Sequence, residues 1–115
     1  MSKRRPYNHD LYRELQNATT DYVKGETVKE RETFYCTHAC LEDSTTAPIS
    51  IGFGKLVGNN FTCLEEEPNP VLGVMYHTEK THHFITDEVP CFRVEGGTLV
   101  DICRGHIEGY KEAIQ

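Results

Sequence analysis

The first hydrophobic pattern along the chain has the spacing of an α-helix. Four apolar residues follow the i, i+4, i+7, i+11 spacing of one helical face: Leu11, Leu15, Ala18 and Tyr22. Asn8 or Asp10 can cap such a helix at its start, and Gly25 can end it. The pattern predicts a helix from about His9 to Val23.

The end of the chain shows a second helical pattern. Ile107, Tyr110 and Ile114 fall on one face of a helix that would run from Arg104 to Ile114. Together the two patterns predict one helix near each end of the chain.

Between these helices the sequence has β-prone runs separated by turn residues. The runs cover residues 34–41, 49–57, 61–65, 71–77, 82–86, 91–95 and 98–103. Hairpin turns are expected at Gly58-Asn59-Asn60, at Thr78 to Thr81 and at Gly96-Gly97. Gly52 and Gly54 indicate a bulge or a close backbone approach within the second run. The predicted fold class is α+β: an N-terminal helix, an antiparallel β-meander of about five to six strands and a C-terminal helix.

Hairpin pairing selects residues with candidate functional roles. Across Gly96-Gly97, Asp101 would lie opposite Phe92, where a buried carboxylate needs a partner such as His106, a backbone group or the last helix. Across Thr78 to Thr81, Tyr76 would lie opposite His83. These positions give two candidate catalytic residues, Asp101 and His83, and three candidate ligand-binding residues: Arg93, Tyr76 and His106.

The five cysteines and six histidines raise the question of a metal site. Cys36, His38 and Cys40 would share one face of a strand, but steps of about 6.7 Å are too long for one ion without a bend. His77 and His82 would face each other across the predicted hairpin, close enough to bind one metal ion. The favoured expectation is that the protein has no cofactor and that its cysteines pack as small hydrophobic residues. The alternative is a composite zinc site with four ligands: Cys36, Cys40, His77 and His82.

Composition and charge restrict the classes of binding partner that the protein is expected to have. The chain has 115 residues, a length that indicates a single domain over residues 1–115, with a flexible basic tail over residues 1–7. It has 12 basic and 18 acidic residues, so its net charge is −6, and the part from Pro6 onward has 9 basic and 18 acidic residues. Such a body is not expected to bind a nucleic-acid backbone or an anionic membrane. The N-terminus has no apolar segment behind its basic residues, which favours a cytoplasmic protein.

These observations leave three classes of function open. The first is a small, non-enzymatic binding or inhibitor protein that engages a basic protein surface or a small ligand, with a homo-oligomer interface as one location for that ligand. The second is an enzyme, either metal-dependent or a hydrolase with a Cys nucleophile and a His base. The third is an inhibitor that mimics nucleic acid through carboxylates at 65–67, 79, 87 and 88. The sequence leaves open whether the protein is an enzyme.

Overall fold

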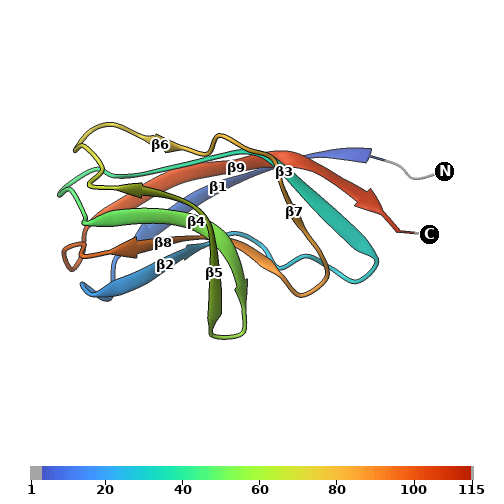
Figure 1. The fold of residues 1–115 in the computed structure, drawn as a ribbon, viewed down its shortest axis with the longest axis horizontal. Helices are drawn as coiled ribbons and strands as arrows, with labels where there is room; N and C mark the ends of the chain where they lie inside the picture. The colour runs from blue at the N-terminus through green and yellow to red at the C-terminus, as the bar shows by residue number, and fades with distance from the viewer. Residues whose placement is uncertain (1–3, 115) are drawn as a thin grey trace.

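The structure, a computed structural model, describes residues 4–114 and shows two antiparallel sheets packed face to face (Figure 1). Nine strands make up the described fold: β1 (Arg4–Glu14), β2 (Thr20–Lys24), β3 (Glu32–Asp43), β4 (Ser50–Val57), β5 (Asn60–Pro68), β6 (Tyr76–His77), β7 (His82–Phe84), β8 (Val89–Glu95) and β9 (Ile102–Ala113). Sheet A has the order β1-β9-β3-β6, with β7 also paired to β3, and sheet B has the order β2-β8-β4-β5. Residues 4–114 contain no helix, so the predicted α+β class is wrong.

The predicted N-terminal helix is replaced by strands β1 and β2. Leu11 and Leu15 are four residues apart, a spacing that suits one face of a strand as well as one face of a helix. Both are buried between the sheets, whereas Ala18 is exposed in the connection between the two strands. The apolar pattern is therefore compatible with a helix and with a strand, and in the structure this segment forms strands. The flexible tail expected over residues 1–7 lies outside the described residues for 1–3, and β1 begins at Arg4.

The predicted C-terminal helix is strand β9, the central strand of sheet A. Ile107 is buried in the core, while Tyr110 lies on the opposite face and stacks on Tyr35 with ring centroids 4.8 Å apart. Gly105 and Gly109 explain why β9 fits closely against β3: an added Cβ would come within 2.0 Å and 1.8 Å, respectively, of a β3 carbonyl oxygen. Two glycines in the middle of the segment also oppose a helix, because glycine is a poor helix former.

The hairpin between β4 and β5 is confirmed. Its turn contains Gly58 with φ of 60°, and Val57 pairs with Asn60. The expected irregularity is also present, because the register shifts between Phe53 and Gly54, where an added Cβ would lie 1.9 Å from the carbonyl oxygen of Thr62. The residues of the turn specify this hairpin, and these residues can be identified from the sequence.

The two other predicted hairpins are wrong. β6 and β7 each pair with β3 and not with each other. The chain after Gly97 leaves sheet B and enters sheet A, so β8 and β9 belong to different layers (Figure 1). Asp101 consequently does not lie opposite Phe92, and a turn closed by the Asp101 N–H on the Thr98 carbonyl oxygen, at 3.1 Å, makes the crossing.

The space between the sheets holds the hydrophobic core. Its largest fully buried side chains come from both layers: Phe34, Leu41, Phe84 and Ile107 from sheet A, and Val23, Ile51, Phe53, Phe92 and Val94 from sheet B. Face-to-face packing leaves the outer face of sheet A uncovered by the other described elements. That outer face carries the residues of the candidate site.

Candidate functional site

A row of polar side chains crosses the outer face of sheet A. In the strand register, Asp10 of β1 lies beside His106 of β9, His106 lies beside Cys40 of β3, and Cys40 lies beside His77 of β6. His38 stands two residues before Cys40 and therefore shares its face. Three strands thus bring histidine and cysteine side chains from distant parts of the chain onto one surface, and β1 adds a carboxylate.

An extra residue in β3 determines which side chains reach this surface. The pairing of β3 with β9 shifts between Cys36 and His38, so Thr37 is the additional residue of a β-bulge. Before the bulge, Phe34 and Cys36 are buried in the core; after it, Ala39 and Leu41 take the buried positions. His38 and Cys40 consequently point away from the core, on the face opposite to that of Cys36.

Three potential ligand atoms converge there. Donor atoms of His38, Cys40 and His77 all lie within 4.8 Å of one another. His38 Nε2 is 2.8 Å from His77 Nδ1, and the two rings stack with centroids 5.0 Å apart and an angle of 17° between their planes. Among residues 4–114, this is the group with the donors and spacing to hold a metal ion.

Neighbouring groups fix two of the three side chains. Glu108 Oε1 lies 3.0 Å from His38 Nδ1, which aims Nε2 of that ring at His77. The chain next to His77 is fixed by Thr78. The Thr78 N–H donates to the Ala39 carbonyl oxygen and the Thr78 hydroxyl accepts from the Ala39 N–H, both at 2.9 Å. A carboxylate on the far nitrogen of a histidine is the usual outer partner of a metal-binding imidazole.

The Cys40 thiol is 7% exposed. Burial, and after it the charges of Glu108 and Glu42, raise the pKa of this thiol above its ordinary value. Cys40 therefore stays protonated at neutral pH without a cation, and a metal ion would have to displace its proton.

The distances fit a tetrahedral transition-metal site with little movement. Two zinc–nitrogen bonds of 2.0–2.1 Å at a tetrahedral angle place the nitrogens about 3.3 Å apart. The observed 2.8 Å between His38 and His77 would have to grow by about half an ångström. Imidazole nitrogen and thiolate sulfur suit zinc or copper and not magnesium or calcium, which take oxygen ligands.

The structure does not bring the four predicted ligands together. Cys40 and His77 are adjacent, but Cys36 and His82 face the interior, on the other side of sheet A. His82 Nε2 is held by Glu65 Oε2 of sheet B at 2.5 Å. The ligand missing from the prediction is His38, which lies two residues before Cys40 and so shares its face of β3.

The candidate catalytic residues lie far apart. His83 is on the outer face of sheet A, with its ring 4.8 Å from that of Tyr35. Asp101 is buried at the other end of β3, beside Asp43, a separation of about 25 Å along the strand. Burial, and then the neighbouring Asp101 carboxyl group, raises the pKa of Asp43 above its ordinary value.

The candidate ligand-binding residues lie in three separate parts of the molecule. Arg93, in sheet B, pairs with Glu66 and Glu95 at 3.1 Å each. Tyr76 is buried against Phe92 in the core. His106 is on the outer face of sheet A, where its Nδ1 lies 3.0 Å from Asp10. Of the three, only His106 adjoins the cluster.

The buried cysteines do not support a nucleophile. Burial raises the pKa of Cys36, Cys91 and Cys103 to about 12 each. Nucleophilic cysteines need a lowered pKa and access to substrate, and these three thiols have neither.

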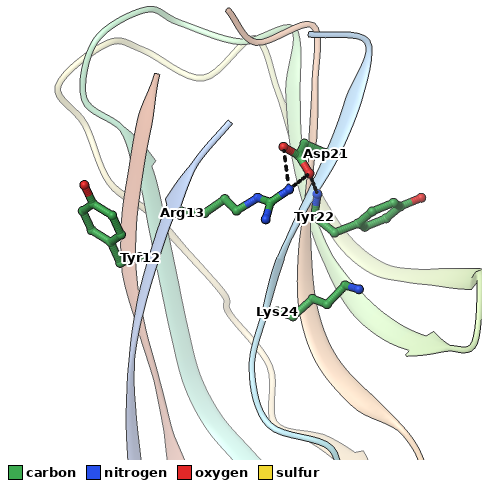
Figure 2. A pocket seen from close by; sticks show the side chains of 5 residues that line it. All are labelled: Tyr12, Arg13, Asp21, Tyr22 and Lys24. Carbon is green, nitrogen blue, oxygen red and sulfur yellow. Dashed lines mark hydrogen bonds and ion pairs between the residues drawn. The ribbon is translucent and has the colours of Figure 1, made fainter. Parts of the chain in front are cut away.

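A cleft of about 310 Å³ lies between β1 and β2, lined by Tyr12, Arg13, Asp21, Tyr22 and Lys24. Figure 2 shows Arg13 and Asp21 pointing toward each other across it, at 3.0 Å. Burial raises the pKa of Asp21, but backbone donors and Arg13 outweigh it and hold the pKa below its usual value. The ion pair satisfies both of these charges and links β1 of sheet A to β2 of sheet B.

Comparison of the chain with protein-family profiles, curated proteins and solved structures finds no match. Residues 4–114 include no helix long and apolar enough to span a membrane.

Proposed function

We propose that the protein is a non-enzymatic binding protein whose small ligand is a transition-metal ion such as Zn²⁺. The observation that carries this proposal is the convergence of His38, Cys40 and His77 within 4.8 Å on the outer face of sheet A. Their two imidazoles and one thiol are the donors that zinc prefers in proteins.

The surroundings of the cluster support the same ligand. Glu108 orients His38 as an outer partner orients a metal-binding histidine. Paired strands also hold the cluster, since two of its residues belong to β3, in the interior of sheet A, and the third to β6, which pairs with β3. A preformed site of this kind lowers the ordering cost of binding.

The acidic surface is a weaker basis for function. Of the acidic residues expected to mimic nucleic acid, Glu65, Glu66 and Glu88 make internal contacts with His82, Arg93 and Lys55 respectively. Charges held in this way are less available to a partner. Recognition of a basic protein surface stays a prediction, and no step of the present proposal depends on it.

The proposal is tested by zinc titration of protein prepared without a histidine tag, in competition with a chromophoric chelator. We expect one equivalent of Zn²⁺ to bind. His38→Gln, Cys40→Ala and His77→Gln should each weaken the affinity by about 100-fold or more, and Glu108→Gln by about tenfold.

His83→Gln is the matched control, because His83 lies on the same face but outside the cluster. Its zinc affinity should equal that of the wild type. Binding of less than about a tenth of an equivalent, or equal losses for His77→Gln and His83→Gln, would overturn the proposal.

A further inference from the structure

The loop between β5 and β6 forms a small apolar pocket next to the proposed metal site. The pocket has a volume of about 170 Å³, and His77 is part of its wall. Its apolar lining comes from four residues of the loop: Pro70, Val71, Val74 and Met75. A single side chain thus belongs both to the metal cluster and to an apolar cavity.

The local sequence explains this pocket. The Val74 N–H donates to the Val71 carbonyl oxygen at 3.1 Å, which closes a four-residue turn. Gly73 has φ of 79° at the third position, where such a turn needs a residue that tolerates positive φ. The turn brings Val71 and Val74 together at the pocket and leaves Leu72 at its tip, outside the lining.

The exposure of the loop is unusual for a segment with a purely structural role. Val71, Leu72 and Val74 are 67%, 51% and 59% exposed. Three aliphatic side chains in four residues form an apolar patch that water solvates poorly, and patches of this kind mark binding surfaces.

The metal cluster supplies a second binding element at the same place. His38, Cys40 and His77 provide three ligands, and a tetrahedral ion has a fourth position that another donor can fill. Because His77 lines the pocket, a molecule bound to the ion beside His77 can extend an apolar group over Val71 and Val74.

Size and charge restrict the molecule. A cavity of about 150 Å³ with apolar walls accommodates benzene, so 170 Å³ matches one ring or a group of similar size. Glu67 in the pocket wall and Glu108 beside His38 disfavour an anion. We infer that the site binds a small molecule in which a neutral nitrogen donor is attached to one compact apolar group, the nitrogen completing the coordination of the metal.

This inference rests on the proposed function, and the experiment separates the two. Zinc affinity is measured first for the wild type, Val74→Asn and Leu72→Asn. The zinc-loaded proteins are then titrated with imidazole and with phenylimidazole by calorimetry, and the zinc-free wild type is titrated with phenylimidazole.

We expect all three proteins to bind zinc equally, and zinc-loaded wild type to bind phenylimidazole about tenfold more tightly than imidazole, because the ring is removed from water. Val74→Asn should abolish this preference, and Leu72→Asn, the control outside the pocket, should retain it. The zinc-free protein should bind phenylimidazole at least about tenfold more weakly than the loaded protein.

Several results would overturn the inference while leaving the metal site intact: equal affinity for the two imidazoles, equal effects of the two variants, or phenylimidazole binding that does not depend on zinc. A zinc-dependent dimer that excludes both imidazoles would do the same, because a second copy would then fill the fourth position. Failure to bind zinc would overturn the proposed function and this inference with it.

Discussion

On the side of β3 that pairs with β6 and β7, a cysteine lies directly opposite a histidine twice, and the two pairs have different environments. Cys36 lies opposite His82, and Cys40 lies opposite His77. The first pair faces the core, where Glu65 holds the imidazole; the second faces outward, where His38 joins it. The types of residue are the same, so the direction in which the strand turns each pair decides whether it is structural or free to take a ligand.

The bulge at Thr37 produces this difference. In a regular strand, residues 36 and 40 would lie on one face, and the extra residue sends them to opposite faces. One inserted residue thus separates a thiol that faces the core from a thiol that faces outward beside His38 and His77.

The comparison can be tested most strongly through the two carboxylates that hold the histidines. Glu65 accepts hydrogen bonds from the N–H groups of Glu79 at 2.8 Å and Lys80 at 3.2 Å, and it also holds His82. Glu65→Ala should therefore cost about 3 kcal/mol of unfolding free energy, a fall of about 12 °C in Tm for a chain of this size. Thermal unfolding followed by circular dichroism measures it.

Glu108→Ala is the matched change on the outer pair. Its side chain is 45% exposed, so we expect a loss below about 1 kcal/mol. Equal losses for the two variants would contradict the assignment of the inner pair as structural and the outer pair as free.

The cysteines give the second test. Cys36→Ala removes a sulfur from the core and should cost about 1.5 kcal/mol while leaving zinc affinity unchanged. Cys40→Ala should cost about half as much or less in denaturant unfolding and should remove zinc binding. A loss of zinc binding in Cys36→Ala would show that the two faces are not independent.

The third test concerns a buried carboxyl group in which one oxygen lacks a donor. Asp43 Oδ1 accepts from the N–H groups of Thr45 and Thr46, but Asp43 Oδ2 and Asp101 Oδ2 have no donor. Burial, and then Asp101, raises the folded-state pKa of Asp43 above its ordinary 3.8, so the folded protein holds this proton more tightly than the unfolded chain. The destabilisation is therefore absent below about pH 3.8, grows as pH rises through the folded pKa, and is complete above it.

Asp43→Asn keeps the acceptor and supplies a donor to Asp101. It should stabilise the protein by about 1 kcal/mol at pH 7, and the gain should shrink toward zero near pH 4. Urea unfolding at the two pH values measures this, and a gain that is independent of pH would contradict the raised pKa of Asp43 in the folded protein.

Local signals predicted local structure, and long-range pairing stayed out of reach of the sequence. The β4–β5 turn was recognised because Gly58 tolerates positive φ, a property of one residue. The helices were predicted wrongly because Leu11 and Leu15 satisfy two periodicities, and Gly105 and Gly109 were the overlooked signals against a helix. Which runs pair with β3 depends on the packing of whole sheets.

The same limit explains why the sequence predicted only part of the candidate metal site. The sequence alone identified Cys40 and His77 as candidate ligands, because cysteine and histidine side chains are common metal ligands in proteins. His38 was not among the predicted ligands, because a regular strand spaces Cys36, His38 and Cys40 too widely for one ion. Nothing in Cys36-Thr37-His38 reveals the bulge that turns Cys36 into the core.

The central position of β9 in sheet A determines when the site can form. Arg4 pairs with Glu112 and Cys40 pairs with His106, so sheet A needs both the first and the last described strands. Contacts between segments so distant in the sequence form slowly, because a long loop must close before they give any stabilisation. During synthesis, the β4–β5 hairpin can fold as it emerges, whereas the outer face of sheet A is completed only after the last strand leaves the ribosome. A metal ion that binds there, with Glu108 of β9 as the outer partner of His38, therefore recognises sheet A only after β9 has paired with β3.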